Sequence, residues 1–172
     1  MFAFLGVIAV QNADEGFKAD AEEAFKTYSG VVYKHAYIRT GNTADADDIL
    51  SDVFVRLVKN IKKIKNEVHL KAWLIRTTIN CSNTYYKRSK RINQVRLTEV
   101  DAVTTPTENV VLPAVLSLPI HQKTVVYMHY FEGYSVDEIA TLCGVAKGTV
   151  KSRLARARET LKTILEGVDL DV

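Results

Sequence analysis

Basic and short polar side chains gather near the end of the chain, on the side of an expected helix that faces away from its apolar stripe. Val150, Leu154 and Ala157 have helical spacing and form that stripe. The residues that point the other way are Lys147, Thr149, Lys151, Ser152, Arg153, Ala155 and Arg156. Arginine and lysine can donate to guanine edges or phosphates, serine and threonine make short polar contacts, and alanine permits close approach to a base. We therefore predict a helix that reads DNA, against the alternative of a helical hairpin with a solvated basic face.

The residues before this helix provide the elements that would position it. Ser135 and Glu138 have the spacing of a capping box, which marks the start of a short helix. Gly144 interrupts that helix after Leu142 and suits a turn that requires a positive φ. A short helix, a turn and a longer basic helix form a helix-turn-helix, whose second helix enters the major groove of DNA.

Acidic residues mark a second expected helix, in the first half of the chain. Asp45, Asp48 and Asp52 share one face of this helix, which Thr43 would cap and whose apolar residues run from Ile49 to Ile61. Acids in a first turn interact favourably with the helix dipole, which explains Asp45 and Asp48 without any partner. Asp52 lies too far along the helix for that explanation. The pattern indicates an acidic surface that docks on a basic partner.

A polar ridge is expected on a third helix, from about Val68 to Arg88. Its members are Arg76, Asn80, Asn83 and Lys87, spaced by four, three and four residues. Apolar residues flank the ridge: Leu70, Leu74, Cys81 and Tyr85 on one side, and Ile75, Ile79 and Tyr86 on the other. A helix buried on both flanks, with amides and cations between them, suits an exposed nucleic-acid strand, whereas a solvated ridge is the plainer alternative. Trp73 is expected to be a core anchor.

The chain is expected to be all-α, with two small helical domains joined by a linker, the second domain being the helix-turn-helix. We place the first domain at residues 1–90, the linker at 91–111, where helical periodicity fails, and the second domain at 112–172. A helix starting near Phe17 would close near Gly41. Pro119 would occupy the first turn of a helix that ends near Gly133.

The composition, with 47% apolar and 25% charged residues among 172, is that of a folded protein, and the net charge of +3 is modest. Cys81, Cys143 and the four histidines lack metal-ligand spacing, so we expect no metal, no cofactor and a reduced, cytoplasmic setting. The apolar residues 1–10 lack the basic start of a signal peptide, and we expect them to pack on the first domain without membrane insertion. No set of catalytic groups is apparent, which predicts a protein that is not an enzyme.

Several stretches resemble the extracytoplasmic-function (ECF) sigma factors of bacterial RNA polymerase. The residues from Leu118 to Ser135, Glu138 to Ala140 and Gly148 to Arg158 are similar to region 4 of that family. Asp45 to Leu57 is similar to region 2.2, and His69 to Asn80 to regions 2.3 and 2.4. The resemblance implies an alternative sigma factor that directs promoter-specific transcription initiation and has no catalysis of its own.

The resemblance also implies partners and site residues. In the family, region 2 binds the polymerase β′ clamp and melts and captures the −10 element, and region 4 reads the −35 element. Polymerase contacts are implied at Asp45, Asp48, Ile49, Asp52 and Arg56, and −10 contacts at Asn66, His69, Arg76, Asn80, Asn83, Lys87 and Arg88. The −35 contacts would be Lys147, Thr149, Lys151, Ser152, Arg153, Ala155 and Arg156. The implied partners are core RNA polymerase, at its β′ clamp and β flap, promoter DNA and, as for many members, an anti-sigma factor.

Two other functions compete with this interpretation. A stand-alone helix-turn-helix regulator would carry a ligand pocket or a self-complementary dimer face within its N-terminal half. An enzyme acting on nucleic acid would need a carboxylate cluster, a metal set or a nucleophile with its base. The acidic residues of this chain cluster only at a helix start, which disfavours the enzyme.

Overall fold

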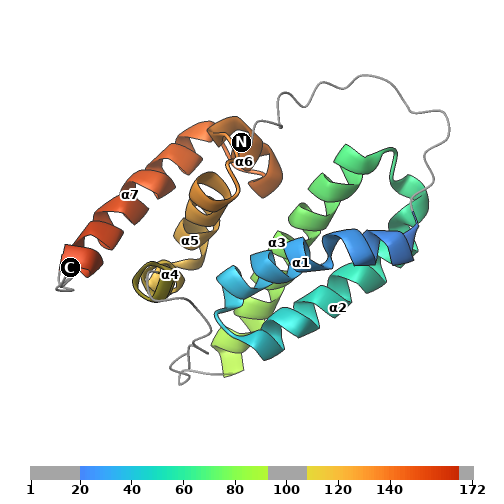
Figure 1. The fold of residues 1–172 in the computed structure, drawn as a ribbon, viewed down its shortest axis with the longest axis horizontal. Helices are drawn as coiled ribbons and strands as arrows, with labels where there is room; N and C mark the ends of the chain where they lie inside the picture. The colour runs from blue at the N-terminus through green and yellow to red at the C-terminus, as the bar shows by residue number, and fades with distance from the viewer. Residues whose placement is uncertain (1–19, 93–107, 167–172) are drawn as a thin grey trace.

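The first domain is a bundle of three α-helices. The computed structural model describes residues 20–92 and 108–166, and all elements in these ranges are helical. The first domain contains α1 (Ala21–Thr40), α2 (Thr43–Asn60), the short 3-10 helix η1 (Ile61–Lys63) and α3 (Glu67–Ile92) (Figure 1). Asp20 caps α1 by accepting from the amides of Glu22 and Glu23, at 2.8 and 2.9 Å. Gly41, at φ 81°, ends the helix in the left-handed region that glycine adopts without strain.

The second domain is built from shorter helices around one long one. Its elements are α4 (Glu108–Ser117), α5 (Ile120–Val126), the π-helical turn η2 (Tyr127–Phe131), α6 (Val136–Cys143) and α7 (Lys147–Glu166). In η2 the hydrogen bonds lengthen to the i−5 pattern, as between the Glu132 amide and the Tyr127 carbonyl, at 3.2 Å. The expected all-α fold of two domains is confirmed, including a helical segment that ends close to Gly133.

The two domains pack against each other along an interdomain seam, which has α1 and α3 on one side and α5, η2 and α6 on the other. Ile75 and Ile79 of α3 are 1% and 5% exposed and belong to the same apolar core as Val125 and Ile139 of the second domain. A separate core lies inside the first domain and includes Leu57 and its neighbours from α1 and α3. One flank of α3 is therefore buried by its own domain and the other flank by the second domain.

Several element boundaries differ from the sequence-based expectation. Asn42, not Thr43, caps α2, because its side chain accepts from the Asp45 amide at 2.8 Å. The helix α3 continues to Ile92, and α4 already begins at Glu108, so both intrude on the linker expected at 91–111. Pro119 precedes α5 as its cap residue and does not lie within the first turn. Tyr86, expected in a buried flank, is 49% exposed.

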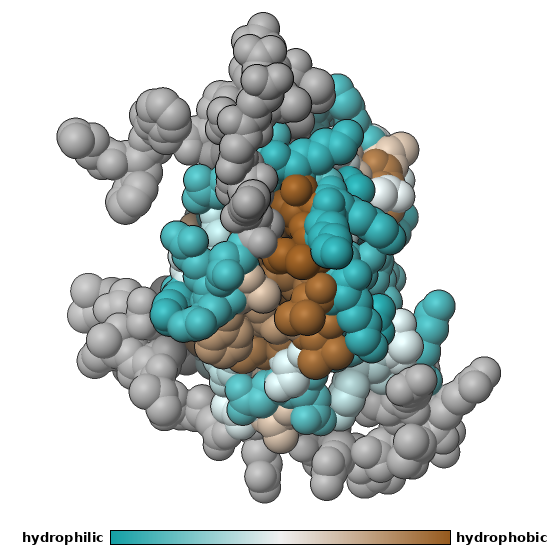
Figure 2. Space-filling model, turned by 90° about the vertical axis from the view of Figure 1, so that its right-hand side faces the viewer, coloured by the Kyte–Doolittle hydropathy of each residue, from teal (hydrophilic) through white to brown (hydrophobic). Residues whose placement is uncertain are grey.

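One face of the first domain carries exposed apolar side chains. Figure 2 shows an apolar band between hydrophilic ridges on the face at the right of Figure 1. Phe25 of α1 and Val55 and Val58 of α2 are exposed, and the Phe25 ring meets the Phe54 ring edge to face at 4.9 Å. No helix in the described ranges is long and apolar enough to cross a membrane. The expectation that residues 1–10 pack on the first domain concerns residues outside those described.

Candidate nucleic-acid interface

The helix α7 presents the basic and polar face that its periodicity predicts. Val150, Leu154 and Ala157 are buried against the second domain's core. On the opposite side Lys147, Lys151, Ser152, Ala155 and Arg156 are exposed, while Thr149 and Arg153 are half-buried. The Ser152 hydroxyl donates to the Thr149 carbonyl at 3.0 Å, so it can still accept from a ligand. This face can contact both base edges and phosphates of a DNA duplex.

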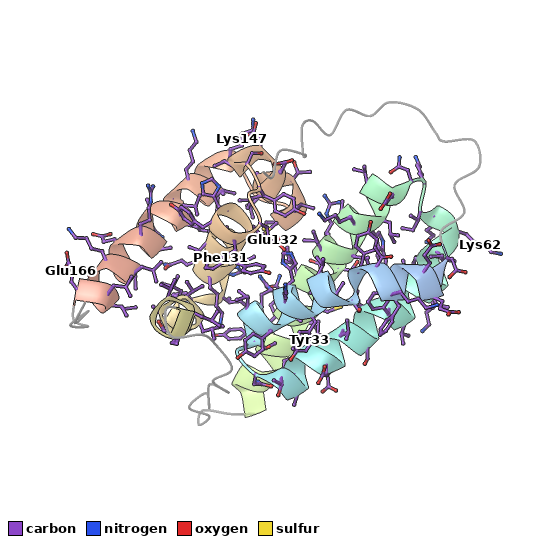
Figure 3. All side chains as sticks on the ribbon, in the orientation of Figure 1. Tyr33, Lys62, Phe131, Glu132, Lys147 and Glu166 are labelled. Carbon is purple, nitrogen blue, oxygen red and sulfur yellow. The ribbon has the colours of Figure 1, made fainter. Side chains whose placement is uncertain are left out.

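Local contacts fix the angle between α6 and α7. The Glu138 amide donates to the Ser135 hydroxyl, and the Ser135 amide donates to the Glu138 carboxylate at 2.8 Å, which confirms the capping box. Gly144 has φ 65°, the left-handed conformation expected in the turn. Lys147 at the start of α7 pairs with Asp137 of α6, at 2.7 Å, and is labelled in Figure 3. The helix-turn-helix is thus held by a cap, a turn and an exposed ion pair.

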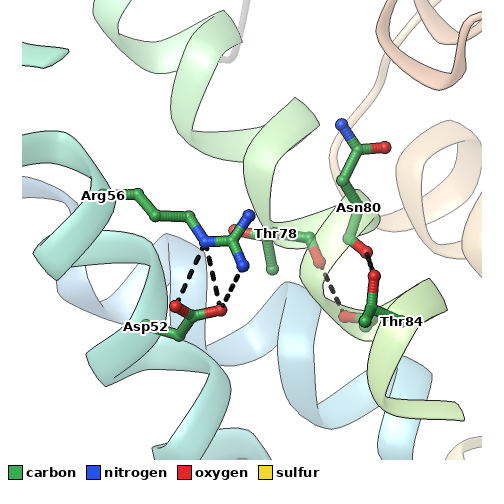
Figure 4. Close-up of polar contacts among 6 residues, drawn as sticks. Asp52, Arg56, Thr78, Asn80 and Thr84 are labelled. Carbon is green, nitrogen blue, oxygen red and sulfur yellow. Dashed lines mark hydrogen bonds and ion pairs between the residues drawn. The ribbon is translucent and has the colours of Figure 1, made fainter. Parts of the chain in front are cut away.

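The acidic face of α2 is divided between surface and interior. Asp48 is exposed, and Asp52 holds Arg56 through contacts of 2.9 and 3.1 Å (Figure 4). Asp45 instead accepts from the Tyr85 hydroxyl and from the Asn42 side chain, so it ties α2 to α3 and is half-buried. Ile49 is 2% exposed and packs in the core of the first domain, so its contact with a partner stays a prediction that this burial does not favour. Of the five residues predicted to contact polymerase, Asp48 and Arg56 are exposed and Asp52 is half-buried.

Burial disfavours the thiolate form of both cysteines. Burial raises the pKa of Cys81 to about 12, assisted by a hydrogen bond to Asp52, and burial also raises the pKa of Cys143. Both thiols therefore stay protonated near neutral pH. No group of histidine, cysteine or acidic side chains in the described part of the chain could hold a metal ion.

The polar ridge of α3 is only partly open. Asn80 and Lys87 are exposed, and in Figure 4 the Asn80 amide points away from Thr84, whose hydroxyl donates to the Asn80 carbonyl. The Arg76 guanidinium donates to the carbonyl of Thr141 in α6, at 2.8 Å. Asn83 is half-buried and accepts from Arg39 at 2.6 Å. Two of the four ridge side chains are thus engaged in contacts, one directly with the second domain.

The loop before α3 is organised by two residues that the sequence singled out. The Asn66 side chain accepts from the His69 amide at 2.8 Å and so caps α3. The His69 ring accepts from the Lys65 amide at 3.2 Å. Both side chains shape the loop from Lys63 to His69, so any contact that they make with a strand would use their remaining atoms. The side chain of Arg88 lies outside the described ones.

Sequence reasoning missed the polar centre of the seam. Arg39 of α1 is 3% exposed and donates to the Thr124 hydroxyl of α5, to Asn83 and, at 3.4 Å, to the Ile79 carbonyl. Burial lowers the pKa of Arg39 to about 10 and, with help from Arg39, that of Lys123 to about 8. From the sequence, an arginine in the last turn of a helix is expected to be exposed to solvent. The residues near Arg39 give no sign that a distant domain buries it, so its role could not be predicted.

Comparisons with known proteins agree in pointing to one family. The model of Sigma-70 region 2 matches residues 24–92, and the model of Sigma-70 region 4 matches residues 110–161. The chain is 30% identical over 149 residues to the ECF RNA polymerase sigma factor SigM of Mycobacterium tuberculosis, covering 84% of this chain and 76% of that protein. It is 26% identical over 173 residues to the ECF RNA polymerase sigma factor SigW of Bacillus subtilis, covering 89% of this chain and 91% of the relative.

The fold is also similar to that of a solved structure. The sigma factor RpoE of Bartonella quintana, solved in complex with the anti-sigma factor NepR, matches with a TM-score of 0.72 at 21% identity. The match covers 88% of this chain and 98% of that chain, so it extends over both domains.

Proposed function

We propose a role for each domain on the premise that this chain belongs to the ECF family of RNA polymerase sigma factors. It is an alternative sigma factor, which binds core RNA polymerase and directs transcription initiation at specific promoters. Such a factor acts by binding and not by catalysis, in the bacterial cytoplasm where the polymerase works. The regulator with an N-terminal sensing domain is disfavoured, because residues 24–92 match region 2.

The second domain is proposed to read the −35 element as duplex DNA. The observation that carries this proposal is the exposed face of Lys151, Ser152, Ala155 and Arg156 on the second helix of a capped helix-turn-helix. A helix presented in this way fits the major groove, where a bidentate arginine distinguishes guanine from other bases. Lys147, Thr149 and Arg153 surround that face and are suited to phosphate contacts.

The first domain is proposed to bind polymerase and the −10 element. Asp48, Asp52 and Arg56 form the surface that we assign to the β′ clamp, since acids exposed on a rigid helix suit a basic partner surface. Arg76, Asn80, Asn83 and Lys87, with the loop from Lys63 to His69, are assigned to the unpaired non-template strand.

Further partners and boundaries follow from the same family. The β flap of polymerase is a proposed partner of the second domain, and an anti-sigma factor is a proposed regulator. The domain limits are proposed at 1–90 and 112–172 with a linker at 91–111, although the helical structure continues to Ile92 and resumes at Glu108.

Run-off transcription tests the proposed function directly. Core polymerase, the purified chain and a library of promoter fragments are combined, and the transcribed fragments are sequenced. We expect transcripts only when chain and core polymerase are both present, from fragments that share one motif near −10 and another near −35. A library with no transcript enriched above core polymerase alone would reject the proposal.

A further inference from the structure

We propose that the apolar residues 2–10 of this chain cover exposed apolar side chains at one end of the first domain. We call that surface the end face and define it by Phe25, Val58 and Val68. The occupant is a segment of the same chain, which lies before the described residues. This inference does not depend on the roles proposed for the promoter and polymerase contacts.

Three helices bring exposed apolar side chains to this end of the bundle. Phe25 lies in the second turn of α1, Val58 in the last turn of α2 and Val68 in the first turn of α3. They are 46%, 60% and 60% exposed. Figure 1 shows these helix ends together, and the apolar band of Figure 2 lies on the same side of the molecule. Single exposed apolar residues are ordinary, but a group of large ones marks a surface that takes a partner.

Contacts between the helices hold the end face together. The Phe25 ring meets the ring of Phe54 at 4.9 Å, and Phe54 lies one turn before Val58 on α2. The Tyr28 hydroxyl donates to the Glu67 carboxylate at 2.8 Å, which ties the start of α1 to the start of α3. The end face is therefore fixed by the packing of the bundle and does not depend on one mobile side chain.

The composition of residues 2–10 suits this surface. Eight of the nine residues are apolar, the ninth is Gly6, and none is charged. Phe2, Phe4 and Leu5 are large enough to cover the gaps between exposed valine and phenylalanine side chains. Burial of such side chains against an apolar surface is favourable in proportion to the area removed from water. Contact between the two apolar parts removes both from water.

The length of chain before α1 allows this contact. From Val10 to Asp20, the cap residue of α1, an extended chain spans at most about 35 Å. Phe25 is five residues further along the helix, about 7.5 Å from Asp20. A tether of this length gives the segment an effective concentration on the order of millimolar beside the end face. A segment of the same chain is therefore favoured over a separate molecule.

The charges between the apolar segment and α1 complement those beside the end face. Residues 11–19 contain Asp14 and Glu15 against a single lysine. Lys59, Lys62 and Lys63, all exposed, follow Val58 at the end of α2 and in η1. The acidic residues would approach these lysines when residues 2–10 lie on the end face, and opposite charges at a contact favour its formation and fix its orientation.

The end face lies on a different flank of α2 from the proposed polymerase contacts. Phe54 and Val58 are one turn apart on one flank, and Asp52 and Arg56 are one turn apart on another. Two residues along a helix correspond to a rotation of about 160° to the other side. Residues 2–10 can therefore cover the end face while Asp52 and Arg56 stay accessible.

The first test measures how well the end face is protected in the full-length chain. Val58→Cys places a thiol on the end face, and Lys34→Cys places one on the opposite side of α1 from Phe25, as the matched control. Each is made with natural residues 1–10 and with the double substitution Phe4→Asp and Leu5→Asp. The rate of maleimide labelling is followed by peptide mass spectrometry, which separates the introduced cysteine from Cys81 and Cys143.

Carboxylates in residues 2–10 oppose burial, so the double substitution should uncover the end face. We expect it to speed labelling of Val58→Cys about tenfold, as for a face that is open about a tenth of the time in the natural chain, and to leave Lys34→Cys unchanged. If Val58→Cys loses helical circular dichroism, Val68→Cys takes its place. Labelling of the end-face cysteine at the same rate with both forms of residues 1–10 would overturn the proposal.

Other occupants of the end face give different results. Protection by a second copy of the chain increases with protein concentration, so labelling is repeated over a tenfold range, in which the proposal expects no change. Protection that increases over this range would assign the face to a second copy and overturn the proposal. Equal labelling rates, together with sedimentation of the natural chain but not the double variant with phosphatidylglycerol vesicles, would assign residues 2–10 to a membrane surface and also overturn it.

A second test uses thermal stability and needs no label. Leu5→Ala and Val58→Ala are made singly and together, and Tm is measured by circular dichroism. If Leu5 packs on the end face, the loss of Tm in the double variant should be smaller than the sum of the two single losses. Leu5→Ala with Lys34→Ala is the matched control, whose losses should add. Losses that add equally well for both pairs would overturn the proposal.

Discussion

His35 of α1 and Glu132 at the end of η2 lie 2.9 Å apart, Nε2 to Oε2, across the interdomain seam. The histidine side chain is 1% exposed, and Figure 3 shows the labelled Glu132 between the two domains. Neither atom completes a well-aligned hydrogen bond, so the pair is best described as a close electrostatic contact. The Tyr127 ring, 5.4 Å from the imidazole and edge to face, covers it from the second domain.

This contact predicts a loss of stability when the carboxylate is removed. Glu132→Ala removes the side chain that lies against the buried His35 ring in the seam and should lower the free energy of unfolding by about 1 kcal/mol. Urea denaturation followed by circular dichroism measures the change. Glu159→Ala, on the exposed face of α7, is the matched control and should change stability by less than about 0.5 kcal/mol. Equal midpoints for both variants would show that the contact contributes nothing.

The docking surface on α2 predicts a specific loss of polymerase affinity. Replacing both Asp48 and Asp52 by lysine sets like charges against a basic partner surface and should weaken binding to core polymerase at least about tenfold. The Asp52–Arg56 pair is half exposed, so its loss should leave the helix folded. Glu23→Lys with Asp47→Lys makes the same change of charge elsewhere. The affinities are measured by titration of labelled core polymerase. If the two double variants bind with equal affinity, Asp48 and Asp52 do not form the docking surface.

The two asparagines of the ridge predict different phenotypes. Asn80→Ala should reduce promoter opening while leaving duplex binding unchanged, since the Asn80 side chain is exposed and available to an unpaired strand. Asn83→Ala should also reduce promoter opening, but it should lower the stability of the protein as well, because it removes a hydrogen-bond partner of Arg39 in the seam. Permanganate reactivity of −10 thymines reports opening, and a gel-shift assay reports duplex binding. Normal thymine reactivity with Asn80→Ala would show that the ridge does not bind the unpaired −10 strand.

On α7, we expect Arg156 and Arg158 to differ in their effect on DNA sequence preference. Arg156→Ala should flatten the preference at one or two −35 positions, with a loss of about 1 to 3 kcal/mol of discrimination. Arg158, whose Nε donates to the Leu154 carbonyl at 3.4 Å, should affect affinity for all sequences alike. Selection from a randomised −35 library compares the two variants. If Arg156→Ala selects the same −35 motif as the natural chain, Lys151 or Ser152 must recognise the bases in place of Arg156.

Lys123 predicts a pH-dependent contribution to stability. Its pKa falls from 10.5 to about 8 on folding, mainly through burial, so between these values the unfolded chain binds a proton that the folded chain does not. Stability from this residue therefore decreases as pH falls from 10.5 to 8 and is constant below. The cost near neutral pH is at most about 3.5 kcal/mol, from roughly 1.4 kcal/mol for each pKa unit.

Lys123→Met removes this titration. The difference in unfolding free energy between the variant and the natural chain should favour the variant most at pH 8 and below, and should shrink toward pH 10.5. Tyr28 and Cys81 titrate in the alkaline range in both proteins, so their contributions cancel in the difference. A difference that does not vary with pH would show that Lys123 keeps its ordinary pKa in the folded protein.

The sequence alone determined the features that depend on neighbours within a few turns of helix. The capping box of Ser135 and Glu138, the turn at Gly144 and the inward face of α7 follow from residue type and spacing, and the structure has all three. The same periodicity indicated that Ile75 and Ile79 would be buried. These predictions succeed because hydrogen bonds and side-chain contacts within a helix join residues at most a few positions apart.

Only the tertiary structure decided what covers each face. The spacing of Asp45 and Asp48 is the same as that of any exposed acidic pair, but Tyr85 of another helix binds the Asp45 carboxylate and leaves it half-buried. Likewise Arg39 and Thr124 are 85 residues apart, and their contact exists because two domains pack together. The period of a helix tells which residues share a face, whereas the partner of that face depends on how distant segments pack.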